Sequence, residues 1–493
     1  MALWSKWIIH EHEDQRAAPS TWPKIAVPGP ASIEDVKRTV IQSCHVATCD
    51  AADTEYQSGH VVIEGGRIAS VGPGLAPAAA AGVETETIDA EGCLLTPGLI
   101  NAHHHLFQWS TRAVSQDETL FGWLTTQYPI WARMDEEIVH ASAAAGLGWL
   151  ALTGCTTSSD HHYLFPERGG DLLEAEITAA RRIGLRFHPA RGAMDLGQSA
   201  GGLPPDSVVE DRDVILAATE AAIDRYNDSS EDSMLRIVVG PCAPFNVTQE
   251  LMRESALLAR RKGVRMHTHL AETADEDEYC EAHFHCTPAQ FVEQLDWLGD
   301  DVWMAHCVHL NDEAIERFAQ TGTGVAHCPT SNGRLGAGIA PLTSMLRAGV
   351  PVGLGVDGPA SNESGRMVDE LHQALLLARL RGGPLALSAR QALRTATVGG
   401  ARCLGRGREL GTIETGKLAD IAVWDVGGLA GSGIADPVAT LVFGAPALHR
   451  LFVGGRQVVS EGRLLTADEE DLARQAGRAA EALRVRAAGG FYA

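Results

Sequence analysis

Histidines and acidic residues recur directly after apolar runs in the middle of this 493-residue chain. In the clearest case, TPGLINAHHH, an apolar segment ends in His103, His104 and His105. In an extended strand, residues i and i+2 point to the same side, so His103 and His105 can face one partner while His104 faces elsewhere. Imidazole nitrogens brought together in this way are common metal ligands. The run therefore predicts a metal site.

Further runs along the chain supply the other groups that such a site needs. HTHLAE contains His269 and, three residues later, Glu272, while AHCVHL contains His306 and GLGVD ends in Asp357. Two imidazoles from one strand, a third from His269 and a carboxylate from Asp357 suit one divalent ion per subunit, zinc or ferrous iron. Glu272 and His306 can then move protons to and from an activated water. A structural zinc site needs no such groups, so the pattern favours catalysis.

A buried histidine with one hydrogen-bond partner is ordinary in a protein core, and this is the preferred interpretation of His188 and His309. The set as a whole is not explained in that way. Its members fall repeatedly at the same end of successive apolar runs, and independent core histidines have no reason to do so.

The elements that must position these residues are eight strand-like runs that alternate with helix-like stretches. The runs are CLLTPGLI, TGCTTSSD, LRFHPA, LRIVVGPCAP, VRMHTHLAE, DVWMAHCV, TGVAHCP and VPVGLGVD. This alternation predicts an α/β protein with a (β/α)8 TIM barrel, which places functional residues at the C-terminal ends of its strands. An open doubly wound sheet is the alternative, but no GxGxxG follows the first strand.

The two ends of the chain have a different texture, with short β-type runs separated by glycine turns. Residues 34–93 and 405–465 are expected to form one small β-sandwich built from both chain ends, around a barrel at 94–404. Residues 1–33 are punctuated by proline and charge and are expected to be an arm. Residues 466–493 predict an amphipathic helix that packs on the barrel or on a second subunit, and we expect a homo-oligomer, a dimer or higher.

Composition limits the classes of partner. The chain has 63 acidic and 40 basic residues and a net charge of −23, which excludes nucleic acid and anionic membranes because both need a concentrated basic surface. No run approaches the ~20 apolar residues of a membrane span, and none resembles a signal-peptide core. The ten cysteines are scattered singly. A cytoplasmic protein with reduced thiols is therefore expected, with a small-molecule substrate.

Five motifs together are similar to the amidohydrolase superfamily, in particular to its deaminase and chlorohydrolase branch: PGLINAHHH, HTHLAE, AHCVHL, AHCPTSN and GVDGPASN. The C-terminal GTIETGKLADIAVWD resembles a strand of that family's β-sandwich. The resemblance covers roughly residues 41–465 and implies a mononuclear metal in a (β/α)8 barrel. It implies four metal ligands and two further proton-transfer groups, which are His103, His105, His269 and Asp357, with Glu272 and His306.

Members of the superfamily that hold two metals bridge them with a carbamylated lysine on the fourth barrel strand. No lysine lies between Lys37 and Lys262, so this bridge cannot form and one metal ion is expected. The resemblance also implies that Glu272 favours loss of an amine, which must be protonated as it leaves.

Further stretches are most similar to the family members that deaminate 8-oxoguanine: HHHLFQ, FGWLTTQYPIWAR, DHHYLFP, ARGAMDLGQSAGGLPP and GPCAPF. The expected reaction converts 8-oxoguanine to urate and ammonia. Triazine (hydroxyatrazine-type) and pteridine (isoxanthopterin) aminohydrolases share parts of this set and are alternatives. A non-catalytic barrel that serves as a scaffold or binding protein is the alternative of another class. Nucleoside-specific relatives carry a glutamate near Trp131 and a histidine where this chain has Cys242, and these departures favour a free base.

Besides Cys242, four side chains are candidates for substrate binding. Gln108 could bond a ring edge, Arg191 could hold a ring carbonyl, His161 is a third polar candidate and Trp123 could be a pocket aromatic. Each has a structural alternative. Gln108 could cap a loop and Arg191 could pair with an acid of the barrel, while His161 could support a ligand and Trp123 could belong to the core.

Overall fold

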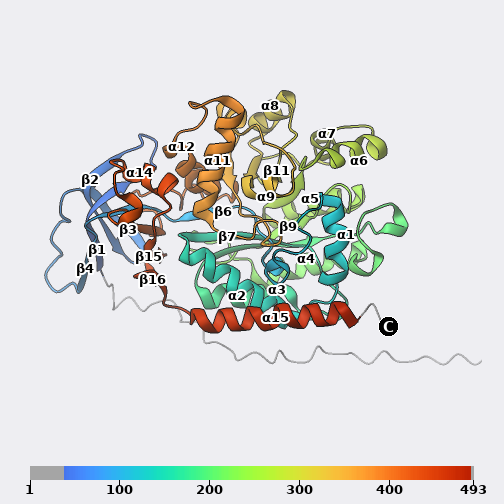
Figure 1. The fold of residues 1–493 in the computed structure, drawn as a ribbon, viewed down its shortest axis with the longest axis horizontal. Coiled ribbons are helices and arrows are strands. Elements are labelled where there is room, and N and C mark those ends of the chain that lie inside the picture. Colours follow the sequence, from blue (N-terminus) through green and yellow to red (C-terminus); the bar gives the residue numbers. More distant parts are fainter. Residues whose placement is uncertain (1–37, 490–493) are drawn as a thin grey trace, which may run out of the picture. The chain divides into compact units, whose positions relative to one another are not determined.

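The computed structural model describes residues 38–489, and the predicted arm at 1–33 lies outside them. In the described part, the chain forms a closed eight-stranded parallel barrel and a separate nine-stranded sheet (Figure 1). The barrel with its additional sheet from both chain ends, predicted from the alternation of runs and the glycine turns, is confirmed.

All eight predicted barrel strands are present, and they pair in parallel around the barrel in chain order. They are β6 (Leu99–Asn101), β7 (Cys155–His162), β8 (Arg186–Ala193), β9 (Val238–Pro241), β10 (Met266–Leu270), β11 (Val302–His306), β12 (Gly324–His327) and β13 (Val352–Leu354). The barrel closes where Leu354 of β13 pairs with Asn101 of β6. Every residue of β7, β8 and β10 is buried, as expected where helices cover one face of a parallel sheet and side chains fill the interior.

Helices between the strands form the outer layer. α3 shows why they begin and end where they do: Asp171 accepts a hydrogen bond from Glu174 N at its start, and Gly184 ends it in a left-handed conformation. The main helices are α1 (Leu120–Trp131), α2 (Glu136–Leu152), α3 (Leu172–Ile183), α4 (Arg212–Tyr226), α5 (Gln249–Lys262), α6 (Ala274–Phe284), α7 (Pro288–Gln294), α8 (Asp312–Thr321), α9 (Pro329–Arg334), α10 (Leu342–Ala348), α11 (Met367–Gly382) and α12 (Ala389–Arg394). Shorter helical segments are α13 (Gly400–Cys403) and α14 (Pro437–Ala439).

The nine-stranded sheet is assembled from two distant segments, and Figure 1 shows the blue early strands beside the red late ones. β5 and β14 join the two segments, with Leu95 opposite Val423. The strands are β1 (Arg38–Ala47), β2 (Glu55–Glu64), β3 (Arg67–Pro73), β4 (Thr85–Asp89), β5 (Cys93–Pro97), β14 (Ile421–Asp425), β15 (Leu448–Val453), β16 (Arg456–Ser460) and β17 (Arg463–Leu464).

The run CLLTPGLI, predicted as one barrel strand, is divided between the two sheets. Cys93–Pro97 forms β5 of the nine-stranded sheet and only Leu99–Asn101 enters the barrel, so the barrel starts later than residue 94. The change of sheet occurs at Gly98, where a Cβ atom would lie 2.2 Å from Cγ2 of Thr156. Glycine therefore permits the close approach of this backbone to the side chain of Thr156.

The C-terminal helix α15 (Glu469–Gly489) packs on the barrel, which is one of the two arrangements predicted for it. It contacts α1, α2 and the short helix η1 (Leu106–Thr111) (Figure 1). Leu472 and Leu483 on this helix are buried.

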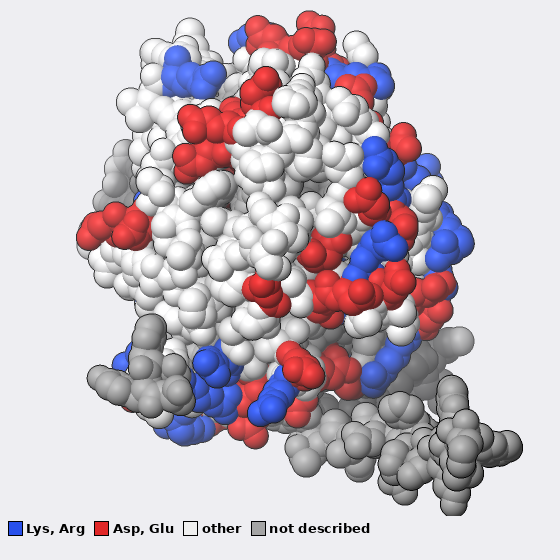
Figure 2. Space-filling view, turned by 90° about the vertical axis from the view of Figure 1, so that its right-hand side faces the viewer, with Lys and Arg blue, Asp and Glu red and all other residues white. Residues whose placement is uncertain are grey.

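The described residues can also be compared with the expectations about cysteines, membrane-spanning helices and surface charge. All ten cysteines lie in this part of the chain, where each is buried as a free thiol. None of the described helices combines the length and the hydrophobicity that a membrane span requires. On the face in Figure 2, the described lysines and arginines are interspersed with aspartates and glutamates.

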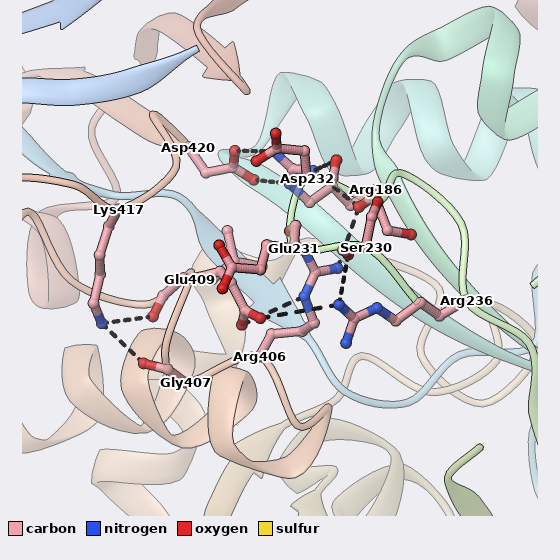
Figure 3. Close-up of polar contacts among 12 residues, drawn as sticks. Arg186, Ser230, Glu231, Asp232, Arg236, Arg406, Gly407, Glu409, Lys417 and Asp420 are labelled. Atoms are coloured by element: carbon pink, nitrogen blue, oxygen red, sulfur yellow. Dashed lines mark hydrogen bonds and ion pairs between the residues drawn. The ribbon is translucent and has the colours of Figure 1, made fainter. Parts of the chain in front are cut away.

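A buried ion pair joins the N-terminal ends of the barrel strands to the nine-stranded sheet (Figure 3). Nε and Nη2 of Arg186, the first residue of β8, donate to Oδ2 and Oδ1 of Asp420 at 2.9 and 3.0 Å. Oδ1 of Asp420 also accepts from Gly454 N at 2.7 Å. Arg406 lies close by, and burial lowers the pKa of its guanidinium to about 10.

We expect Arg186→Met to lower the free energy of unfolding by about 3–5 kcal/mol, because the substitution leaves the carboxylate of Asp420 buried without its charged partner. The double variant R186M/D420L removes both charges and should recover much of the loss. Thermal unfolding followed by circular dichroism measures both changes. A single variant as stable as the wild type would contradict the importance assigned to this ion pair.

Candidate active site and metal centre

The C-terminal ends of the barrel strands hold a cluster of buried histidines and acids. His103 and His105 follow β6, His269 lies on β10 and Asp357 follows β13. The three imidazoles offer nitrogen atoms within 4.8 Å of one another. Oδ1 of Asp357 lies 3.3 Å from Nε2 of His103 and 3.4 Å from Nε2 of His105. The structure therefore brings the four predicted ligands to one point.

Hydrogen bonds to the backbone determine which nitrogen of two imidazoles is free. Nδ1 of His105 donates to the carbonyl of His161 at 2.6 Å, and Nδ1 of His269 donates to the carbonyl of Cys242 at 2.7 Å. Each Nδ1 therefore carries the proton, and the two Nε2 atoms keep their lone pairs. These Nε2 atoms are only 3.0 Å apart. Two lone pairs at this distance repel each other unless a cation lies between them.

His103 is oriented by His267, to which the sequence analysis assigned no role. Nδ1 of His267 donates to the carbonyl of Trp303 at 2.9 Å, so its Nε2 accepts from Nδ1 of His103 at 2.8 Å. Nε2 of His103 is left without a hydrogen-bond donor and faces Asp357. The alternation in HTH was the available signal, because His267 and His269 share one face of β10. Partners of this kind fix the tautomer of a metal ligand.

The protonation states of the four groups fit a divalent ion. Burial lowers the pKa of His103 and of His269 well below the usual value, so both imidazoles are neutral. Burial would raise the pKa of Asp357, but its contact with His103 and the charge of His306 outweigh this effect and hold that pKa well below its usual range. Neutral imidazoles and an ionised carboxylate are the forms that bind metal, and this donor set suits zinc or ferrous iron.

The backbone is unusual where the strands deliver these groups. φ is +63° at Asp357 and +69° at His306, in the left-handed region that residues other than glycine seldom adopt. Hydrogen bonds hold the side chain of Asp357 from both sides: Gly358 N donates to Oδ1 at 2.7 Å and Ser331 Oγ donates to Oδ2 at 2.5 Å. Such conformations persist where the surroundings enforce them, as they do at functional sites.

Glu272 and His306 face each other beside the cluster, with Oε2 and Nε2 3.6 Å apart. Nδ1 of His306 donates to Oδ1 of Asn332 at 2.9 Å, which directs Nε2 toward Glu272. Burial raises the pKa of Glu272 to about 7, against the charge of His306. Burial alone would lower the pKa of His306, but the charges of Glu272 and Asp357 outweigh it and the pKa is raised. Groups that titrate near neutrality are suited to proton transfer.

A pocket opens beside these groups. Helix α1 contributes Trp123 and Tyr128 to the lining. Tyr128 was not predicted as a site residue, although the spacing of aromatic residues in WLTTQYPIW was an available signal. The other apolar and aromatic residues of the lining are Leu120, Leu124, Tyr163, Ala243, Phe245 and Leu335. Among the described residues, Oε1 of Gln108, Nε1 of Trp123 and the hydroxyl of Tyr128 are buried without hydrogen-bond partners. A largely apolar wall with a few free polar atoms is typical of a site for a small heterocycle.

Three of the five candidate substrate contacts line this cavity: Gln108, Trp123 and Cys242. Gln108 lies against Gly358, where a Cβ atom would come 1.8 Å from its Oε1.

Arg191 and His161 are not among the residues that line this cavity, and their contact with a substrate stays a prediction. Arg191 donates to both carboxylate oxygens of Glu210, at 2.8 and 2.7 Å, as in the alternative prediction that it pairs with an acid. The ring of His161 is buried against the metal cluster, with its centroid 4.9 Å from that of His269, and its carbonyl orients His105. Sequence could not distinguish these two positions, because His161 and Arg191 also lie near the C-terminal ends of barrel strands.

His188 is buried, as expected of a core histidine, whereas His309 is exposed and the expectation of a core position is wrong for it. Nε2 of His188 lies 3.5 Å from Nη1 of Arg406, near the N-terminal ends of the strands and away from the metal cluster. His309 bonds the carbonyl of Ala337 through Nε2 at 2.9 Å.

Comparisons with known proteins place this geometry in context. A family model described as "Amidohydrolase family" matches residues 94–458. An 8-oxoguanine deaminase of Pseudomonas aeruginosa is 41% identical over 430 residues, which cover 86% of this chain and 95% of that protein. An isoxanthopterin deaminase from an unknown prokaryotic organism is 38% identical over 414 residues, 79% of this chain and 86% of that protein. The crystal structure of atrazine chlorohydrolase TrzN from Arthrobacter aurescens TC1, complexed with zinc, superposes with a TM-score of 0.84 at 34% identity, over 90% of this chain and 100% of that one.

Proposed function

The chain belongs to the amidohydrolase family, and from that premise we propose that it deaminates a free purine-like base, 8-oxoguanine, to urate and ammonia. Family membership makes it a hydrolase of carbon–nitrogen bonds, and the ring is the proposed part. The observation that supports a deaminase most directly is the opposition of Glu272 and His306, 3.6 Å apart, at the edge of the metal cluster. A hydrolytic deamination needs two such groups, because one proton must reach the ring and another the leaving amine.

In this proposal His103, His105, His269 and Asp357 hold one divalent ion, either zinc or iron. The ion supplies Lewis acidity, which makes water nucleophilic near neutral pH. Ionised Glu272 accepts a proton from the attacking water and delivers it to the ring nitrogen beside the amino-bearing carbon. His306 and Asp357 take part in the second transfer, so that the carbon–nitrogen bond breaks as the amine leaves as ammonia and the ring carbon keeps an oxygen.

The cavity lining supports a neutral free base. Among the described residues that line it, none is a lysine or an arginine, so a phosphate would find no cationic partner there. The unpartnered Nε1–H of Trp123 can donate to a ring oxygen or nitrogen, and Oε1 of Gln108 can accept from a ring N–H. An oxopurine presents both kinds of group on its edges. The 41% identity to an 8-oxoguanine deaminase supports this ring in particular.

A pteridine or triazine aminohydrolase is the second candidate, because the same chemistry serves any ring with an electrophilic amino-bearing carbon. The 38% identity to an isoxanthopterin deaminase and the superposition with an atrazine chlorohydrolase favour these rings. A non-catalytic scaffold is disfavoured, since a scaffold has no use for the complete set of ligands and proton-transfer groups.

Ammonia release from a panel of bases tests the proposal. Zinc-loaded protein is incubated with 8-oxoguanine, guanine, isocytosine, isoxanthopterin and a hydroxylated aminotriazine, with metal-free protein as the control. We expect 8-oxoguanine to give the highest kcat/KM, with urate as the second product. A preference for the pteridine or the triazine would support deamination but reject 8-oxoguanine as the substrate. No release from any base by metal-loaded protein would reject deamination.

A further inference from the structure

Three glutamates outside the cavity are completely buried in the outer layer of the barrel: Glu176 on α3, Glu276 on α6 and Glu370 on α11. Glu276 and Glu370 lie in the first turn of a helix that follows a barrel strand, where the helix dipole favours a negative charge, and Glu176 lies in the second turn of α3. A buried carboxyl group is costly unless its oxygens are hydrogen-bonded. The partners of each glutamate therefore indicate what it holds in place.

Both carboxylate oxygens of Glu276 accept hydrogen bonds from the segment that delivers Glu272. Oε1 accepts from Ala271 N at 2.8 Å, and Oε2 accepts from Glu272 N at 3.0 Å. Ala271 has φ of +49°, a left-handed conformation that alanine adopts only where its surroundings enforce it. The carboxylate of Glu276 thus holds a turn that the residues of the turn do not favour by themselves.

We propose that Glu276 is a positioning residue for Glu272, an inference that rests on the role of Glu272 in the proposed function. The chain turns sharply after His269 and reaches Glu272 three residues later. Two hydrogen bonds fix the direction of the backbone at Glu272, and with it the approach of its Oε2 to Nε2 of His306. A displacement of about 1 Å at a proton-transfer group can lower the rate about 100-fold.

The chemistry of the contact identifies the most informative substitution. Both partners of Glu276 are N–H donors, so both of its side-chain atoms must accept. Glu276→Gln keeps the volume of the side chain but offers one acceptor, and its amide N–H would oppose the second backbone N–H. This variant therefore breaks one of the two bonds without creating a cavity.

Glu176 provides the matched control. It is equally buried on an outer helix and bonds Nδ1 of His162 at 2.8 Å, and neither residue lines the cavity or is one of the four predicted metal ligands. Glu176→Gln makes the same chemical change at the same depth. A loss of stability common to any buried glutamate would appear in both variants.

The test compares the full-length, metal-loaded wild type with E276Q and E176Q. Amide hydrogen exchange of peptides that include Ala271 and Glu272 is measured, together with metal content, kcat and KM for a base that the wild type deaminates. We expect E276Q to exchange faster at these two amides, to retain metal and to lose about 100-fold in kcat with a small change in KM. E176Q should keep the wild-type kcat and the wild-type exchange at these amides.

Each measurement can contradict the proposal that Glu276 positions Glu272. Unchanged exchange at Ala271 and Glu272 in E276Q, unchanged kcat in E276Q, or an equal loss of kcat in E276Q and E176Q would overturn the proposal. If the wild type releases no ammonia from any base, the proposed function fails separately. Hydrogen exchange then tests, without a substrate, whether Glu276 holds the backbone at Ala271 and Glu272. Faster exchange confined to E276Q supports this contact, and unchanged exchange rejects it.

Discussion

Replacing His105 by alanine is expected to remove the bound metal and to lower ammonia release by about 1000-fold or more. The substitution deletes one of the three Nε2 lone pairs that converge with Asp357, and leaves His269 without the nitrogen that faces it at 3.0 Å. The Lewis acidity of a bound metal ion lowers the activation barrier by several kcal/mol, and each 1.4 kcal/mol corresponds to a factor of ten in rate. Metal content by mass spectrometry and ammonia release measure the two effects.

His104→Ala is the control for this experiment. His104 lies between the two predicted ligands but does not belong to the convergent group of imidazoles. Its backbone carbonyl, which accepts from His161 N at 2.7 Å, remains in the variant. We expect this variant to keep its metal. Equal loss of metal from His104→Ala and His105→Ala would contradict the argument from strand alternation.

Glu272→Gln is expected to lower kcat by about 100-fold to 10,000-fold with the metal retained, because an amide cannot carry a proton from water to the ring. Stopped or continuous ammonia assays on metal-loaded protein measure the change. A variant that loses its metal as well would show that Glu272 supports the metal cluster, which is a different role from the one proposed.

The pH dependence of the wild type checks the same residue. Burial raises the pKa of Glu272 to about 7 from an ordinary value of 4.5. Below about pH 7 the carboxyl group is protonated and cannot accept a proton from water, so kcat/KM should fall as the pH falls through 7 and reach a plateau above it. The residual activity of E272Q should lack this acidic limb. An unchanged limb in E272Q would assign it to another group.

The ligand set could be predicted because its geometry is local. The alternation within HHH and HTH determines which side chains face the barrel interior, and no knowledge of distant contacts is required. The barrel could be predicted for a similar reason, since the eight apolar runs alternate with amphipathic stretches. The same alternation places His267 on the face of His269, but its role as the partner of His103 depends on the positions of Trp303 and His103 in the fold.

The features that sequence did not predict depend on distant partners. Arg191 lies at a strand end like the site residues, but Glu210, 19 positions later, determines where its guanidinium points. The division of CLLTPGLI between two sheets depends on the pairing of β5 with β14, more than 320 residues away. Such choices follow from packing between elements rather than from the properties of either segment.

The union of β5 and β14 has a consequence for the nascent chain. Nε1 of Trp424 donates to Oγ1 of Thr96 at 3.0 Å across 328 positions of sequence, and the whole barrel is encoded between them. At a synthesis rate of about 5–20 residues per second, the ribosome needs roughly 16–65 s to produce the partner of β5. During that interval β5 presents an unpaired strand edge, which is the kind of surface that recruits chaperones or leads to aggregation. Premature termination anywhere in the barrel would make that exposure permanent.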